Sequence, residues 1–317
     1  MAEKSRRRSQ KKKKRKRKYL KWGIGIVVVL LLGVSSVAFS MYHSFMSNMG
    51  KTHVVLDRDQ SKHRIQKVNF QRKDPFSILL LGVDGRSGEN GRSDTIIVLT
   101  VNPNSKDIKM LSIPRDTYTE IVGKHSFDKI NHAYAFGGIK MSMDTVEKLL
   151  NIPIDYIAEV NMDGFSEMID AIGGITVESP YAFEQNGYYF KIGKNQLDGK
   201  GALAYIRNRH DDPEGDFGRQ QRQQQLISGV IKEAVSVDSL FNYQDIFNSL
   251  GNNIQTNLTF KEIMDLQKNY KDSITHIDQF HFEKGNGEII NGIWYYKMDE
   301  AELKKISTEL RKHLEIS

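Results

Sequence analysis

Five side chains that bind anions stand close together in one part of the chain: Arg207, Arg209, Arg219, Arg222 and Gln223. Arg207 and Arg209 are two apart, so on an extended strand they would project from one face. The other three are spaced three and four apart, which places them in one stripe on a helix. Planar guanidinium groups favour bidentate binding of phosphate. The pattern predicts a phosphate-binding cluster, with a solvated helix face as the alternative.

A second group of charged residues lies in a glycine-rich loop that contains Asp84, Arg86, Arg92 and Asp94. The loop follows the apolar run 76–83, and ligands of open α/β sheets bind at the carboxyl ends of strands. Two carboxylates there could hold a hard divalent cation through oxygen ligands and water. The alternative is a solvated hairpin. No Gly-Lys-Ser/Thr follows, so this is not a Walker phosphate-binding loop.

A third candidate is Arg115, which follows another apolar run, 108–113, directly after Pro114. Proline fixes the turn, so the cation should point to the same edge of the sheet. The alternative for Arg115 is an ion pair with Asp116 or another nearby acid. Lys129 adds one more cation before a predicted helix.

Apolar runs and helical spacing alternate along the body of the chain. Strands are predicted at 76–83, 95–101, 108–113, 157–160, 175–177 and 203–206. Helices are predicted at 142–150, 164–172, 217–235, 242–250, 260–270 and 299–314. Alternation of this kind favours an α/β fold with a buried central sheet sandwiched by helices, an α/β/α arrangement.

The N-terminus is strongly basic and is followed by an uncharged apolar stretch. Residues 1–21 carry a net charge of +12, whereas the remainder carries −5. Residues 22–42 are long enough to cross a bilayer, and the flanking cations would keep the N-terminal side in the cytoplasm. We predict a cytoplasmic tail at 1–21, one transmembrane helix at 22–42, a stalk at 43–74 and an extracellular domain at 75–317. A cleaved signal peptide is the alternative.

Several kinds of chemistry are excluded or disfavoured by composition. Cysteine is absent, which excludes disulfides, thiolate metal sites and a cysteine nucleophile. The nine histidines show no zinc-binding spacing, and no Gly-x-Ser-x-Gly elbow occurs. The mildly acidic body argues against nucleic acid as a partner. Tyr295 and Tyr296 are interpreted as core or edge packing rather than as a sugar platform.

The charged motifs, in this order behind one N-terminal span, resemble the LytR–CpsA–Psr family, and its wall teichoic acid transferases in particular. The resemblance is strong over residues 75–235. The matching strings are Gly82-Val-Asp-Gly-Arg86, Arg92-Ser-Asp94, Ser112-Ile-Pro-Arg-Asp-Thr-Tyr118, Lys129-Ile-Asn-His132, Gly173-Gly174, Leu203-Ala-Tyr-Ile-Arg-Asn-Arg209 and Asp216-Phe-Gly-Arg-Gln-Gln-Arg-Gln223.

The resemblance implies a membrane-anchored enzyme that takes an anionic glycopolymer from a polyprenyl pyrophosphate carrier. The enzyme would join the polymer to N-acetylmuramic acid of peptidoglycan through a phosphodiester and release polyprenyl phosphate. Family members are similar in having an α/β/α domain with an apolar pocket for the lipid tail.

The resemblance also implies roles for the site residues. Asp84 and Asp94 would bind Mg²⁺ (or Mn²⁺), and one of them would act as base, with Arg115 as the third catalytic residue. The pyrophosphate-binding set would be Arg86, Arg115, Lys129, Arg207, Arg209, Arg219, Arg222 and Gln223. A structural pairing of Arg222 with Asp216 is the alternative for that residue.

Two other functions fit the same residues. A hydrolase would cleave polyprenyl pyrophosphate with water as acceptor. A non-catalytic receptor would bind the lipid or a polyanion without reaction. A transcription attenuator is the least favoured, because only the short basic tail would face DNA.

Overall fold

A computed structural model of the chain describes residues 52–58, 60–84, 91–208, 216–236 and 253–316. All of them belong to one compact unit, 49–317. The predicted tail, the predicted transmembrane helix and the helix predicted at 242–250 lie outside the described residues. Among the helices that are described, none has the length and apolar character needed to span a membrane.

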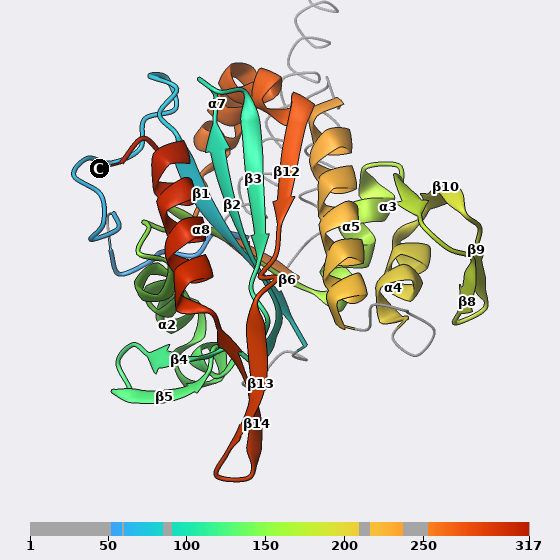
Figure 1. The fold of residues 1–317 in the computed structure, drawn as a ribbon. Coiled ribbons are helices and arrows are strands. Elements are labelled where there is room, and N and C mark those ends of the chain that lie inside the picture. The colour runs from blue at the N-terminus through green and yellow to red at the C-terminus, as the bar shows by residue number, and fades with distance from the viewer. Residues whose placement is uncertain (1–51, 59, 85–90, 209–215, 237–252, 317) are drawn as a thin grey trace, which may run out of the picture. The chain divides into compact units, whose positions relative to one another are not determined.

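A six-stranded mixed sheet, with strand order β11-β6-β1-β2-β3-β12, forms the centre of this unit (Figure 1). β1 pairs antiparallel with β2 and parallel with β6. The strands are β1 (Phe76–Val83), β2 (Ser93–Asn102), β3 (Asp107–Ser112), β6 (Tyr156–Asn161), β11 (Ile254–Thr256) and β12 (His276–Phe280).

Both faces of the sheet are covered by helices, because the central strands are apolar on both sides. Leu79, Leu81 and Val98 face a core shared with α2 (His132–Leu150) and α8 (Glu300–His313). Ile97 and Leu99 face a second core shared with α5 (Asp216–Ser236) and α7 (Phe260–Tyr270). The predicted α/β/α layering is thereby confirmed.

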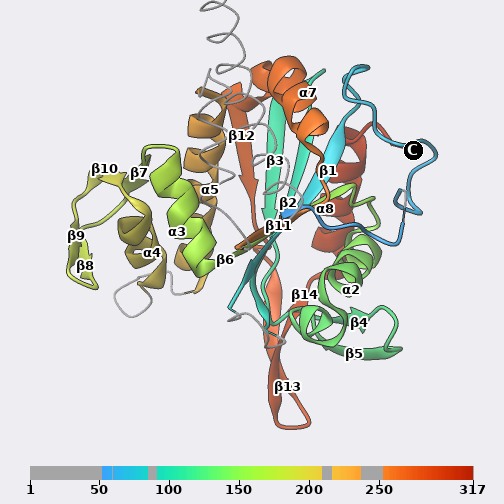
Figure 2. The same ribbon diagram turned by 180° about the vertical axis from the view of Figure 1, so that it is seen from behind.

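A smaller lobe packs against α5 on the side away from α2 (Figure 2). Its core gathers aromatic rings, with Phe183 and Phe190 stacked at 4.6 Å between centroids. Its elements are α3 (Met162–Ala171), β7 (Ile175–Ser179), β8 (Phe183–Gln185), β9 (Tyr188–Phe190), β10 (Gly193–Leu197) and α4 (Gly199–Arg207).

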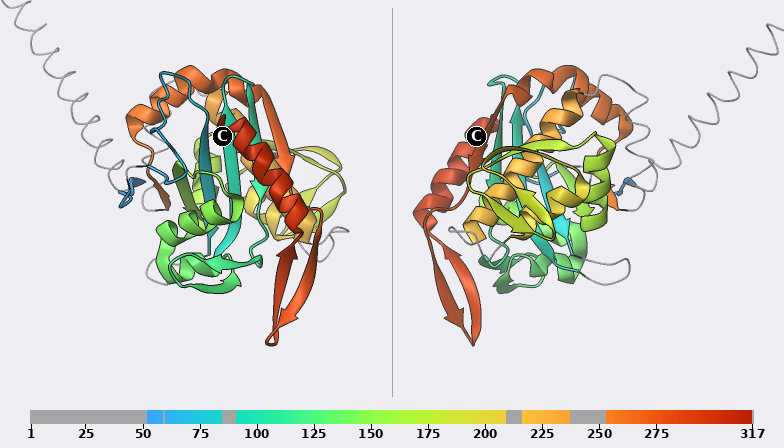
Figure 3. Two further views of the ribbon diagram at one scale, coloured as in Figure 1. Left: turned by 60° about the vertical axis from the view of Figure 1, so that its left-hand side comes forward. Right: turned by 90° about the vertical axis from the view of Figure 1, so that its right-hand side faces the viewer.

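Two hairpins extend from the sheet, one on the side away from the small lobe and one at the bottom in Figure 1. The first pairs β4 (Tyr118–Ile121) with β5 (Ser126–Lys129). The second pairs β13 (Gly285–Ile290) with β14 (Ile293–Met298) and projects well beyond the sheet (Figure 3). Its turn, Asn291-Gly292, has positive φ at both residues, as a two-residue hairpin turn requires.

The segment predicted as a stalk is packed against the body over its described part, so that prediction is wrong from residue 52 onward. Thr52, Ser61 and Phe70 are buried. Arg64 makes a bidentate ion pair with Asp155 at the start of β6, at 2.7 and 2.9 Å. Buried contacts of this kind make the segment part of the folded domain.

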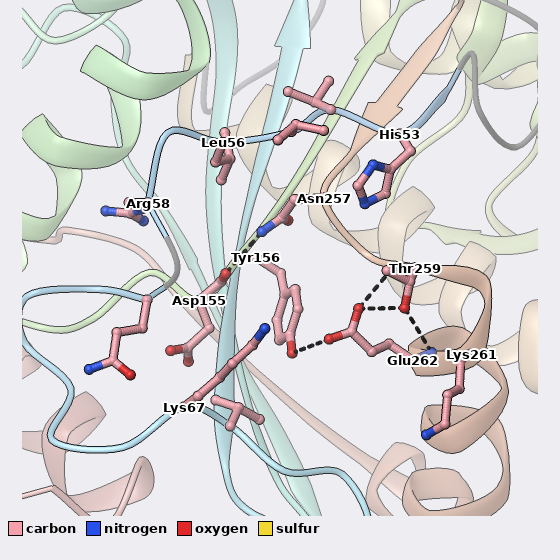
Figure 4. Close-up of a pocket in the computed structure, with 14 residues that line it drawn as sticks. His53, Leu56, Arg58, Lys67, Asp155, Tyr156, Asn257, Thr259, Lys261 and Glu262 are labelled. Atoms are coloured by element: carbon pink, nitrogen blue, oxygen red, sulfur yellow. Dashed lines mark hydrogen bonds between the residues drawn. The ribbon is translucent and has the colours of Figure 1, made fainter.

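A pocket lined by both polar and apolar residues lies between this segment and the start of α7 (Figure 4). Lys67 lines it beside Tyr156, whose hydroxyl donates to Glu262 at 3.2 Å. Glu262 also completes the capping box of α7 with Thr259. The pocket is at the amino end of β6 and therefore at the opposite end of the sheet from the carboxyl end of β1.

Candidate active site

Asp84 and Asp94 come from neighbouring strands at one corner of the central sheet. The β1–β2 register passes from the Gly82–Thr95 pair to the next pair and skips Asp94. An extra residue of this kind is a β-bulge, which bends the strand and re-aims a side chain. Asp84 directly follows β1, and its amide donates to the carbonyl of Arg92 at 3.3 Å. Both carboxylates therefore originate at the carboxyl end of β1, as predicted.

A chain of ion pairs continues from this corner across to the β4–β5 hairpin. Arg115 donates from Nη1 to Oδ1 of Asp94 at 2.8 Å, and its Nε is 3.5 Å from Oδ2 of Asp116. Asp116 in turn pairs with Nζ of Lys129 at 2.7 Å. The ion-pair alternative for Arg115 is confirmed. The side chains of Arg115 and Asp94 are each 29% exposed, so an incoming anion can reach them.

Arg207 does not lie on a strand; it is the last residue of helix α4, so the predicted strand is wrong. Asp198 caps the helix by accepting from the amide of Gly201 at 2.7 Å. Ala202 and Tyr205 are buried in the small lobe. The segment is therefore an amphipathic helix with one buried side, and the Arg207 side chain is exposed at its end.

The basic stripe of α5 faces inward rather than toward solvent, which excludes the solvated-face alternative. Arg219 and Arg222 are 8% and 3% exposed. Arg222 donates to the hydroxyl of Tyr181 at 2.7 Å and to the carbonyl of Asn208 at 2.5 Å. Its guanidinium thus joins α5 to the chain that leaves α4, which favours a structural role for Arg222, and its assignment to pyrophosphate stays a prediction. The side chain of Asp216 lies outside the described part of α5.

Two glutamines of α5 form hydrogen bonds to the strands next to the site. Gln223 donates to Oγ1 of Thr95 at 2.9 Å, one residue from Asp94. Gln224 is buried and donates to Oγ of Ser112 at 2.9 Å. These hydrogen bonds fix the helix against β2 and β3. The basic stripe of α5 is therefore beside the carboxylate corner.

The structure brings most of the predicted set to one end of the sheet. Asp84, Asp94, Arg115 and Lys129 belong to the strand ends and the first hairpin, and Arg219 and Gln223 belong to α5. Arg86 and Arg209 fall outside the described residues.

A buried acid that the motifs did not indicate, Glu159, lies on β6 beside Leu81 of β1. Tyr134 of α2 donates to it, and its Oε2 has no hydrogen-bond partner among the described residues. Burial raises the pKa of Glu159, while the hydrogen bond from Tyr134 opposes the shift. A charged residue within the apolar run 157–160 was the signal that could have identified it.

The donor set at the corner fits a hard cation only in part. Asp84 is exposed, and Asp94 has one oxygen engaged by Arg115. No group of three potential metal-binding side chains occurs in the part of the chain that the structure describes. Mg²⁺ is commonly held by one or two carboxylates together with substrate phosphates and water. The two carboxylates could therefore supply two of the ligands of such a cation, the number that Mg²⁺ commonly takes from protein.

A mixed sheet between helices, with arginines and aspartates gathered at one end, defines an α/β protein with a candidate anion-binding active site. The chain belongs to the LytR–CpsA–Psr family: the LytR_cpsA_psr family model matches residues 39–312. It is 48% identical over 290 residues to the polyisoprenyl-teichoic acid–peptidoglycan teichoic acid transferase TagU of Bacillus subtilis (strain 168). That match covers 92% of this chain and 94% of the relative.

Solved structures give the same result. The crystal structure of B. subtilis TagU matches with a TM-score of 0.65 and 48% identity, over 77% of this chain and 99% of that one. TagT bound to LIIa-WTA matches with a TM-score of 0.71 and 33% identity, over 83% and 100% of the two chains. The fold and the family are thus shared along nearly the whole of each solved chain.

Proposed function

We propose that this chain transfers an anionic glycopolymer, wall teichoic acid, from a polyprenyl pyrophosphate carrier to peptidoglycan. The product is a phosphodiester to N-acetylmuramic acid, and polyprenyl phosphate is released. The identity of 48% to a transferase named for this reaction carries the proposal. The clustered arginines and carboxylates supply an independent chemical reason.

The reaction requires charge compensation more than it requires a covalent nucleophile. A hydroxyl oxygen of the acceptor bonds to the phosphorus that bears the polymer. The bond from that phosphorus to the bridging oxygen breaks, and polyprenyl phosphate leaves with the electron pair. Arg115 and Arg219 would compensate the charge that accumulates on the two phosphates, and Gln223 would donate a hydrogen bond to it. Lys129 and Arg207 would add further positive charge, and Arg209 is assigned to the same set from the sequence motif alone.

The proton of the attacking hydroxyl goes to a carboxylate at the corner. Asp94 is the better base, because it is partly exposed at the bulge while Arg115 fixes one of its oxygens. Asp84 and Asp94 would hold Mg²⁺, which when bound contributes positive charge next to the diphosphate. Arg222 serves as a positioning residue through Tyr181 and Asn208.

The location of the enzyme belongs to the same proposal. Residues 22–42 would anchor the chain in the cell membrane, with residues 1–21 in the cytoplasm and the folded unit outside. The lipid tail of the carrier would then occupy the same membrane as the anchor. The uncharged apolar stretch and its basic flank support this orientation.

The test uses the full chain in detergent with Mg²⁺, a polyprenyl pyrophosphate saccharide and peptidoglycan oligomers, read by mass spectrometry. We expect a phosphodiester-linked saccharide on the glycan and free polyprenyl phosphate. Saccharide phosphate without linkage to glycan would instead establish the hydrolase. Substrate that is bound but remains intact would establish the receptor.

A further inference from the structure

A row of aromatic rings extends from the surface toward the candidate site; we define Phe127, Tyr118 and Tyr295 as the aromatic ledge. Phe127 and Tyr118 stack at 5.3 Å between centroids, and Tyr118 meets Tyr295 edge-on at 5.0 Å. Phe127 is 58% exposed. Lys129 places its ammonium 5.8 Å from the centre of the Tyr295 ring. The ledge therefore begins in solvent at Phe127 and ends at the buried ring of Tyr295, which is 7% exposed and lies beside Lys129 of the predicted site.

The ledge is joined to the reactive corner through direct contacts. Lys129 pairs with Asp116, and Arg115 lies between Asp116 and Asp94. The amide of Tyr296 on β14 donates to the carbonyl of Asp116 at 2.9 Å, which ties the long hairpin to the same loop. A molecule lying on the ledge would thus be guided along three successive ion-paired side chains to the carboxylates.

A second exposed ring stands on the same side of the molecule. Phe136 of α2 is 47% exposed, and the ammonium of Lys124 lies 4.7 Å from its centre. The elements that carry these rings, α2 and the β4–β5 hairpin, lie on one side of the sheet, whereas α4 and α5 lie on the other (Figures 1 and 2). A transfer reaction has two substrates, and each of them can reach the site from a different side of the sheet.

The chemistry of the ledge fits a glycan. Pyranose rings present patches of C–H groups, which are attracted to the negative faces of aromatic rings. Exposed aromatic patches on soluble domains commonly mark binding sites. The exposed Lys124 next to Phe136 would pair with a carboxylate that peptidoglycan carries on its lactyl or peptide groups. An amphipathic strand of sugars with acidic branches is complementary to this surface.

We infer that the aromatic ledge is the acceptor subsite, on which a peptidoglycan glycan strand lies with its hydroxyl directed at Asp94. This inference rests on the proposed function, since it assigns the second substrate of that reaction. It also gives the β13–β14 hairpin a role, because β14 contributes Tyr295 to the ledge and its backbone to the catalytic loop.

The test compares Phe127→Ala with Tyr189→Ala, a matched control whose ring is 71% exposed on β9 in the small lobe. In the full chain, we expect Phe127→Ala to raise the KM for peptidoglycan oligomers about tenfold, as loss of one stacked ring does elsewhere. The KM for the lipid donor and kcat at saturating acceptor should stay unchanged. Phe127→Trp should restore the acceptor KM, and Tyr189→Ala should leave both constants unaltered.

Three results would overturn the inference while leaving the proposed function standing. One is an unchanged acceptor KM in Phe127→Ala, and another is a rise in the donor KM instead, which would assign the ledge to the transferred polymer. The third is failure of Phe127→Trp to restore binding when its melting temperature is normal. Saturation-transfer NMR with a peptidoglycan tetrasaccharide measures binding without turnover. Signal that is present in the wild type and lost in Phe127→Ala would support the ledge even if no transfer occurred.

Discussion

The two ends of the central sheet each carry an arginine paired with an aspartate, but the two pairs differ in exposure. At the amino end of β6, the Arg64 and Asp155 side chains are 9% and 6% exposed. Asp155 accepts there from both nitrogens of the guanidinium fork and from the amide of Ser77. At the other end, Arg115 and Asp94 are each 29% exposed and share one hydrogen bond.

The difference separates a structural ion pair from a reactive one. A carboxylate with all of its acceptor positions occupied by protein donors has nothing left for a substrate. Asp94 accepts from Arg115 through Oδ1, and both side chains are exposed enough for an anion to reach them. The exposure of the pair at one end is therefore the property that suits it to phosphate chemistry, and the experiments on Arg64 and Arg115 probe that contrast.

The largest effect on stability is expected from Arg64→Ala. Removing one partner of a buried ion pair leaves Asp155 charged and uncompensated, which typically costs about 4 kcal/mol. Urea denaturation should show that loss in the free energy of unfolding, whereas transfer activity per folded molecule should be unchanged. A loss below about 1 kcal/mol would place Arg64 with ordinary surface ion pairs.

Arg115→Ala should have the opposite effect to Arg64→Ala, with a loss of transfer activity and little change in stability. Loss of one preorganised donor to a developing charge lowers turnover by about 10²–10³-fold. A partly exposed pair contributes only about 0–1 kcal/mol to stability, so the melting temperature should change little. The control is Arg72→Ala, which removes another arginine–aspartate pair, with Asp74, at 2.7 Å. Normal turnover in Arg115→Ala would contradict a role for this residue in charge compensation.

The smallest effect is expected from Glu159→Gln. The pKa of Glu159 is raised by burial in the folded state, so the native protein binds more protons than the unfolded chain. Stability from this group is fully present below the unfolded pKa and is lost as the pH rises through the folded value. Glutamine removes the charge, and it should stabilise the protein at neutral pH by about 1 kcal/mol.

Thermal unfolding of wild type and Glu159→Gln from acidic to neutral pH measures this effect. The two stability curves should diverge as the pH rises. Parallel curves would show that Glu159 keeps the same protonation equilibrium in the folded and unfolded states.

The sequence predicted the parts of the fold that depend on continuous apolar runs. β1, β2 and β3 appeared within two residues of their observed ends, because strands buried on both faces are uninterrupted apolar segments. α4 was missed because it is short and rich in glycine and alanine, so a strand-like run at 203–206 dominated the pattern. The β13–β14 hairpin was missed because its exposed strands alternate weakly.

Some residues of the candidate site could likewise be placed from the sequence, and others could not. Asp84 and Arg115 were predictable in place, since Asp84 directly follows β1 and Arg115 comes three residues after the end of β3. The inward orientation of Arg219 and Arg222 was not, because helical spacing defines a stripe without saying which way it faces. The aromatic ledge could not be predicted from the sequence. Tyr295 packs at an edge as expected, but its partners are about 170 residues away in sequence, and only the tertiary fold brings them together.

The bulge at Asp94 has a consequence for how this family can change over time. Asp94 is the one residue at that corner that the β1–β2 register passes over, so the pairing of the two strands does not depend on it. A lineage can therefore exchange this acid, or adjust the length of the strand end that carries it, without re-registering the apolar side chains of the sheet. A substitution at Asp94 can therefore change the chemistry of the site while the pairing of β1 with β2 stays the same.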